Sequence, residues 1–235
     1  QQRYDQEIRL QRLTRTYRML SSTSSAILRL RNRMELLEEV CRIASEQGGY
    51  DRVVISLIDP DARTLRPRAW AGTDSVALRA ADCVVLDTSP EPGMAEHAIR
   101  SGMPSIHNDL AREPQPAAQQ GLLTAHGYRA VAALPLLIDG TPIGVIALFN
   151  SQQEVFDPAE VDVLLELTAN LTFGLQYLEK DEAVHFLSYF DSLTGLAKRP
   201  LFCQRLAQLM SPGAADGGTL TVVVFDVQKQ GAIKD

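Results

Sequence analysis

The sequence predicts an α+β fold in which helices cover one face of a mostly antiparallel sheet. Two hairpins lead to this prediction. Residues 52–72 contain two extended runs around an Asp-Pro-Asp turn, and residues 129–150 contain two apolar runs around Asp139 and Gly140. Helical patterns stand before and after the hairpins. Few runs are long enough for the helical crossovers that parallel strands need, so we expect antiparallel pairing.

The first helical block covers residues 3–47. Its seam residues recur at alternating steps of three and four, the spacing of a coiled coil. Ser24 and Arg31 are weak seam residues, and the sequence therefore predicts a break near residues 21–25. Two uses stay open, a dimer seam or one amphipathic helix packed on its own domain. The seam positions are Leu10, Leu13, Tyr17, Leu20, Ser24, Ile27, Arg31 and Met34.

The middle of the chain is less regular than either hairpin. Residues 90–102 predict a short helix closed by Gly102, and residues 104–109 predict a short strand. Residues 115–127 predict a further helix, closed by Gly127. This segment would lie over the sheet as a mixture of loops and short elements.

A long helix is expected after the second hairpin. Asp157 is a suitable N-cap and Pro158 suits the first helical turn. The apolar residues after Pro158 keep helical spacing as far as Leu178. We expect this helix to lead out of the domain.

Composition limits the class of protein. The chain has 235 residues, of which 45% are hydrophobic and 22% charged, as in soluble globular proteins. A net charge of −6 argues against a nucleic-acid-binding surface. The longest apolar run, residues 130–138, is far shorter than the about 20 residues of a membrane span. Three cysteines without C-x-x-C spacing favour a reducing, cytoplasmic setting. A first residue other than Met indicates a piece of a longer protein.

Two stretches match a known family. Residues 36–61, LLEEVCRIASEQGGYDRVVISLIDPD, and residues 127–171, GYRAVAALPLLIDGTPIGVIALFNSQQEVFDPAEVDVLLELTANL, carry its S/A-x-x-x-x-P-L strand, G-x-x-x-G-x-L hairpin and F-x-x-x-[DE] helix start. Over roughly residues 26–180 the chain resembles a GAF domain. The resemblance implies a PAS-like layout, with a central antiparallel sheet, a small-molecule pocket on one face and a dimerising helix bundle on the other.

In that layout the irregular middle segment would build the pocket, because loops over a rigid sheet hold most ligand contacts. Each candidate side chain also has a structural interpretation, such as a helix cap or a core position. The sequence does not identify the ligand, so the cofactor stays unknown. The candidate ligand-binding residues are Trp70, His107, Asp109, Arg112, His126 and Tyr128.

Several ligand classes are disfavoured. His97, His107, His126 and Cys83 lie ten or more residues apart, without the spacing of a metal or haem site. Cys83 stands in an apolar run, where an inert buried thiol is expected in place of an attached bilin. Residues 150–160 partly match the N-K-x-x-F-D-x-x-x-E pattern of cyclic-nucleotide GAF domains, but they lack the Lys and have one spacer residue too many.

Residues 186–202, FLSYFDSLTGLAKRPLF, carry the spacing D-x-L-T-G-L-x-N-R-x-x-F. This stretch resembles the start of a GGDEF domain, a family that condenses two GTP molecules into cyclic di-GMP. Lys198 stands where that family has Asn. The matching residues are Asp191, Leu193, Thr194, Gly195, Leu196, Arg199 and Phe202.

Residues 220–235 match the next motif of that family in register. Asp226 takes the position of a Mg²⁺ ligand, although four other family positions have changed, at Gln228, Gln230, Gly231 and Lys234. The G-G-D-E-F signature itself would lie beyond Asp235. The resemblance therefore implies a degenerate domain, Mg²⁺ only for an intact one, and no catalytic residue in this chain.

Together these patterns predict an N-terminal signalling helix over residues 1–25, a GAF sensor domain over residues 26–180, and a linker helix with a truncated, partial α/β GGDEF-like segment over residues 181–235. The predicted function is a ligand-sensing module of a bacterial cyclic di-GMP turnover protein, homodimeric through its flanking helices. Two alternatives stay open. The GAF domain could be a ligand-free dimerisation scaffold, or the parent could be an active diguanylate cyclase or EAL phosphodiesterase.

Overall fold

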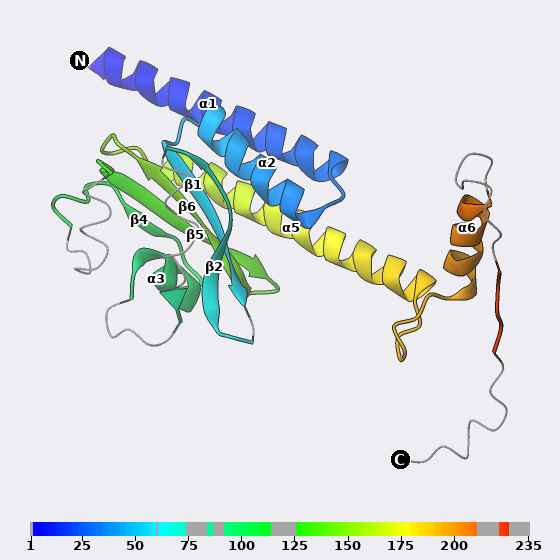
Figure 1. Ribbon diagram of the computed structural model, residues 1–235. Coiled ribbons are helices and arrows are strands. Elements are labelled where there is room, and N and C mark those ends of the chain that lie inside the picture. The colour runs from blue at the N-terminus through cyan, green and yellow to red at the C-terminus, as the bar shows by residue number, and fades with distance from the viewer. Residues whose placement is uncertain are drawn as a thin grey trace. The chain divides into compact units, whose positions relative to one another are not determined.

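The computed structural model describes residues 2–59, 61–73, 84–86, 92–113, 126–210 and 221–225 (Figure 1). The chain divides into two compact units, residues 1–180 and residues 181–235. Each unit is described by itself.

The first unit contains an antiparallel sheet. Within the described residues it has six strands, in the order β3-β2-β1-β6-β5-β4. Both predicted hairpins are confirmed, since β1 pairs with β2 and β5 pairs with β6. The strands are β1 (Arg52–Asp59), β2 (Thr64–Gly72), β3 (Val84–Val85), β4 (Ser105–His107), β5 (Ala130–Ile138) and β6 (Thr141–Asn150).

The turn between β5 and β6 explains why this hairpin was predictable. Asp139 and Gly140 both have positive φ, 49° and 78°. A two-residue turn of this kind matches the right-handed twist of the strands, and Asp-Gly adopts it at low cost. The turn therefore helps to fix the register between β5 and β6.

Helices lie on both sides of the sheet. Three of them, α1 (Gln2–Arg29), α2 (Arg33–Glu46) and α5 (Pro158–Tyr189), lie on one side, and α3 (Met94–Ser101) lies on the other (Figure 1). We call these two sides of the sheet the three-helix face and the α3 face. The antiparallel α+β architecture that the sequence predicts is confirmed, but helices were expected on one face only, and α3 covers the other (Figure 1). The short helix closed by Gly102, with φ of 65°, and the short strand after it are also confirmed.

Strand alternation separates two cores. On the three-helix face, Ile55 of β1 and Leu134 of β5 pack with α2 and α5 residues such as Leu37. On the α3 face, Val131 of β5 packs with Ala98 of α3. Because side chains alternate along each strand, one apolar run supplies both cores.

The predicted break near residues 21–25 is wrong. The hydroxyls of Ser24 and Ser25 donate to the carbonyls four residues earlier, so the serines stay helical. The helix ends at Arg29, and Asn32 caps the next one by accepting from the N–H groups of Met34 and Glu35.

The seam pattern of α1 also divides in two. Leu20 is buried against the domain, whereas Leu10 and Tyr17 are exposed. The helix therefore serves its own domain with one part of the stripe and presents another part to solvent. Most of the helix predicted over residues 115–127 falls outside the described residues, as do Cys83 and Asp226.

In the second unit, α6 (Arg199–Leu209) comes after a turn that is closed by a bridge between Phe190 and Ala197. Nowhere in the described parts of the chain is a helix both long and apolar enough to span a bilayer.

Candidate functional site

The predicted ligand residues fall at three places in the first unit. Trp70 lies on β2 and pairs with Val54 of β1. It alternates with Ala69 of the three-helix core, and so belongs to the α3 face. The others lie at the end of β4, just after it, or just before β5, at His107, Asp109, Arg112, His126 and Tyr128.

His107 sits in a row of polar side chains. Its Nδ1 lies 2.5 Å from Oε2 of Glu113, and its Nε2 lies 3.1 Å from the hydroxyl oxygen of Ser105. The other carboxylate oxygen of Glu113 accepts from the backbone N–H groups of Asn108 and Asp109, both at 3.1 Å. The carboxylate is thus fixed at both oxygens, and the imidazole is fixed by it. Because Ser105 is only 8% exposed, the row holds the ring in place and does not present a free hydroxyl.

The two charged candidates beside this row differ in exposure. The side chain of Asp109 is mostly buried and accepts a hydrogen bond from Nε2 of Gln153 at 2.8 Å. Arg112 lies 3.4 Å from the Asp109 carboxylate but is 88% exposed. Asp109 therefore ties two segments together, whereas the guanidinium of Arg112 faces solvent.

His126 and Tyr128 form part of an aromatic row on the α3 face. Their rings stack with centroids 5.9 Å apart, and Tyr128 lies 5.2 Å from the ring of Phe149. The guanidinium of Arg52 lies 5.8 Å from the Phe149 centroid, within range of a cation–π contact. The Tyr128 hydroxyl oxygen approaches the hydroxyl of Thr73 at 3.4 Å. Tyr128 and Arg52 are only 6% and 4% exposed, so these groups contribute to the packing of the α3 face.

A hydrogen-bonded clamp joins the His107 row to the start of α5. The side-chain N–H of Asn108 donates to the carbonyl of Phe156, and the N–H of Phe156 donates to the side-chain oxygen of Asn108, both at 2.9 Å. The N–H of Glu154 donates to the Asn108 carbonyl at 3.2 Å. Asp157 then caps α5 by accepting from the N–H of Glu160. We call the pair Asn108 and Phe156 the clamp.

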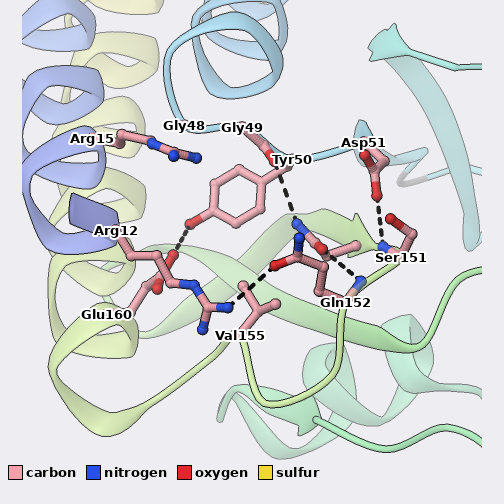
Figure 2. Close-up of a pocket in the computed structure, with 11 residues that line it drawn as sticks. Arg12, Arg15, Gly48, Gly49, Tyr50, Asp51, Ser151, Gln152, Val155 and Glu160 are labelled. Carbon is pink, nitrogen blue, oxygen red and sulfur yellow. Dashed lines mark hydrogen bonds between the residues drawn. The ribbon is translucent and has the colours of Figure 1, made fainter. Parts of the chain in front are cut away.

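A small pocket lies beside the same connection, on the three-helix side (Figure 2). It has a volume of about 100 Å³. Arg12 of α1 donates to the Glu154 carbonyl at 3.0 Å and to Oε1 of Gln152 at 3.2 Å. The pocket is lined by Arg12, Arg15, Gly48, Gly49, Tyr50, Asp51, Asn150, Ser151, Gln152, Val155 and Glu160.

Glu160 forms the buried wall of this pocket. The Tyr50 hydroxyl donates to its Oε1 at 2.6 Å, and the Thr16 hydroxyl does so at 3.4 Å. Burial raises the pKa of the Glu160 carboxyl above its ordinary value, against the opposing effect of the Tyr50 hydrogen bond. Burial, together with the neighbouring Glu160 carboxylate, also raises the pKa of Tyr50. The Glu160 carboxyl therefore stays protonated to a higher pH than the carboxyl of an exposed glutamate does.

Comparison with known families settles the membership of the chain. A family model described as a GAF domain matches residues 31–176. The chain belongs to the GAF domain family. This is a sensory and regulatory ligand-binding fold, and its sheet and helices are those of the first unit.

Solved GAF domains and related proteins share this fold. The chain is similar to free methionine-R-sulfoxide reductase from Neisseria meningitidis in complex with its substrate, with a TM-score of 0.60 and 18% identity over 71% of this chain and 91% of that one. It is similar to the GAF domain of a phosphoenolpyruvate-protein phosphotransferase from Coxiella burnetii, with a TM-score of 0.59 and 15% identity over 73% of this chain and 98% of that one. The corresponding Acinetobacter domain gives a TM-score of 0.55 and 14% identity over 70% and 94% of the two chains. At these identities the likeness shows the fold alone.

A curated relative is similar over a shorter stretch. The "uncharacterized protein in hutH 5′ region" of Streptomyces griseus is 35% identical over 83 residues, which span 35% of this chain and 34% of that protein. The match thus covers about a third of each sequence.

The structure also explains the partial cyclic-nucleotide pattern in this GAF domain. Asn150 ends β6, Phe156 is buried, Asp157 caps α5, and Glu160 bonds Tyr50. Each residue of the pattern therefore has a structural partner. Within the described residues, no three His, Cys, Asp or Glu side chains are grouped so that they could hold a metal ion.

Proposed function

We propose that this chain is the sensory module of a bacterial cyclic di-GMP turnover protein. A small ligand would bind on the α3 face of the GAF domain and change the packing of the helices that lead to the output domain. The observation that carries this proposal is the clamp. It joins the segment that holds His107 to a residue two positions before α5.

The clamp gives a physical route from ligand to helix. Asn108 is held at its N–H by Glu113 and at its side chain by Phe156. Phe156 is 3% exposed and stacks on Tyr50 with ring centroids 5.9 Å apart. Because packed cores resist gradual deformation, a shift of Asn108 would favour a second arrangement of the α5 start. The ligand shifts the population by its difference in affinity for the two arrangements.

The output side of the proposal rests on the turn just after α5. This helix continues to Tyr189, and Asp191 stands two residues later. Its carboxylate accepts from the Thr194 N–H and from the Thr194 hydroxyl, both at 2.9 Å. These hydrogen bonds lower the pKa of Asp191. A closed turn at the motif supports the GGDEF-like interpretation of residues 181–235.

The changed family positions after Asp226 favour a regulatory role for this segment over cyclase activity. We therefore assign the enzymatic activity of the parent to a further domain, with an EAL phosphodiesterase as the favoured kind. Mg²⁺ would be needed only by an intact GGDEF domain. The cytoplasm, where GTP and cyclic di-GMP occur, is the matching location.

Exposed apolar side chains on the flanking helices support a homodimer. Leu10, Tyr17 and Leu28 of α1 are between 57% and 79% exposed, and Phe173 and Tyr177 of α5 are 68% and 46% exposed. Such side chains are typical of helix–helix interfaces. They equally support the second candidate function, a dimerisation scaffold without a ligand.

Native mass spectrometry of the purified chain tests the proposal. Under gentle ionisation we expect a dimer with bound small molecule, and under denaturing ionisation the release of that molecule. Adding it back to stripped protein should slow hydrogen exchange at residues 105–113 and at the start of α5 together. A dimer without adduct, and without a response to candidate ligands, would favour the scaffold.

A further inference from the structure

The pocket beside α1 has features that the sensory role does not use. Figure 2 shows the Arg15 side chain directed from α1 toward the Gly48–Gly49 turn and the Arg12 guanidinium directed toward Gln152, on either side of the Tyr50 side chain in this view. They stand three residues apart on α1, so they share one side of the helix. The pocket surface is mostly polar.

The two arginines differ in what they bind. Arg12 donates to the Glu154 carbonyl and to Gln152. Arg15 makes no hydrogen bond or ion pair with any residue that the structure describes. The Arg12 guanidinium is thus held by protein groups, whereas the N–H donors of Arg15 are available to a ligand.

Gly49 makes the space for the Arg15 head group. A Cβ atom at Gly49 would lie 3.2 Å from Nη1 of Arg15, and the residue has a φ of +75°. A larger residue would therefore be strained and would crowd the guanidinium. The turn keeps the side of the pocket near Arg15 open.

Two cationic groups and two carboxyl groups line the pocket, and both carboxyl groups accept hydrogen bonds from the protein. Among the lining residues, Arg12 and Arg15 are opposed by two carboxyl groups, Asp51 and Glu160. The Asp51 carboxylate accepts the Ser151 N–H at 2.6 Å. Glu160 is buried under Tyr50, and its pKa is raised, so it opposes the arginines less than an exposed carboxylate would.

We propose that this pocket binds a small oxyanion, a phosphate or carboxylate group, between Arg12 and Arg15. Planar guanidinium groups pair with such groups through two parallel hydrogen bonds. A volume of about 100 Å³ holds several water molecules or one oxyanion head group. The inference goes beyond the proposed function, because the site lies on the three-helix side and involves none of the predicted ligand residues.

Binding there would link α1 to α5. Arg12 already contacts the connection between β6 and α5, at Gln152 and Glu154, and the anion would add Arg15 to this contact. The oxyanion would therefore restrict α1 relative to the start of α5. This makes the site a second input to the same helices.

The test is an NMR titration of the full chain with sodium phosphate and, separately, with sodium acetate. Sodium chloride keeps the ionic strength constant. We expect saturable shifts at the backbone N–H groups of Gly49 and Ser151 and at the Arg15 side chain. Arg15→Ala should weaken the affinity at least about tenfold, as expected for a hydrogen bond to a charged group. Arg15 is exposed, so the variant should fold.

Arg18→Ala is the matched control, because Arg18 is exposed on the same helix and does not line the pocket. Its affinity should equal that of the wild type. Saturation by phosphate, by acetate or by both supports the proposal and identifies the oxyanion class. Shifts that do not saturate, or an Arg15→Ala variant that binds as the wild type does, would overturn it.

Discussion

The two faces of the sheet differ in the size of the largest side chains that they bury from β5 and β6. From β5 and β6, the three-helix face buries large aliphatic side chains, at Leu134, Leu136, Ile146 and Leu148. The α3 face buries smaller ones from the same strands, at Val131, Ala133 and Val145. Polar and aromatic groups also gather on the α3 face, among them His107 and Tyr128.

This difference indicates that the two faces of the sheet have different roles. Large, fully buried aliphatic groups supply most of the stability of a domain. The α3 face carries polar side chains of the kind that orient a ligand, such as His107. We therefore assign stability to the three-helix face and, as part of the proposed function, ligand recognition to the α3 face, with the clamp connecting them. Substitutions on each face and at the clamp test this assignment.

Truncation of the scaffold core should cost the most stability. Leu148 is 0% exposed, and Leu148→Ala should lower the free energy of unfolding by about 2–5 kcal/mol. On the other face, Val145→Ala should cost about 1–2 kcal/mol, because fewer methyl groups are removed. Urea denaturation of the two variants measures the difference. Equal losses would mean that the two faces do not differ in this way.

Loss of the clamp should have an intermediate effect. Asn108→Ala removes two hydrogen bonds and leaves the backbone polar groups of buried Phe156 without these partners. The expected cost is about 1–3 kcal/mol in the free energy of unfolding. Asn108→Asp keeps the acceptor for the Phe156 N–H and should recover part of the loss. A neutral Asn108→Ala variant would contradict the role assigned to the clamp.

Glu160 should make stability depend on pH. Its pKa is raised in the folded state, mainly by burial, so the folded protein binds more protons than the unfolded chain does. Stability should therefore fall as the pH rises from the ordinary value of 4.5 through the raised one, and then level off. Tyr50, Thr16, Arg12 and Asp157 face this carboxyl.

Glu160→Gln keeps an acceptor for the Tyr50 hydroxyl and removes the titration. Because only the wild type loses stability through this group, the variant's free energy of unfolding should increase relative to that of the wild type as the pH rises above 4.5. Urea denaturation of both proteins between pH 4 and pH 7 measures this difference. Parallel pH profiles would show that Glu160 titrates as an exposed glutamate does.

Arg112→Ala should have the smallest effect on stability. The side chain is 88% exposed, and its ion pair with Asp109 is screened by water. We expect a change below about 0.5 kcal/mol in the free energy of unfolding. The same variant sharpens the sequence prediction, since weaker binding of a ligand found by mass spectrometry would place Arg112 in the ligand site.

The elements that the sequence predicted correctly are those set by local chemistry. Asp139 and Gly140 accept the positive φ that the hairpin turn needs, and Asp157 caps the helix that begins at Pro158. The break in the first helical block was placed wrongly for a reason that is also local. Serine hydroxyls can bond either to a cap or to the preceding helical turn, and the sequence does not say which.

The site was only partly predictable because its contacts join distant segments. His107 and Asp109 were identified as candidates, but the partner of Asn108 lies 48 residues away. Arg12 reaches Glu154 across 142 residues. No periodicity or spacing connects such positions, since the sheet register decides which residues meet. Glu113 could have been identified from local spacing, because an acidic side chain four residues after Asp109 can reach back to the backbone N–H groups at that end of the turn.

Hydrogen exchange of the wild type and of Asn108→Ala shows whether the clamp couples the His107 segment to α5. We expect the variant to exchange faster both at residues 105–113 and at residues 160–165 of α5, while the hairpin of β1 and β2 is unchanged. Faster exchange confined to residues 105–113 would contradict this expectation, because the start of α5 would then be held independently of the clamp.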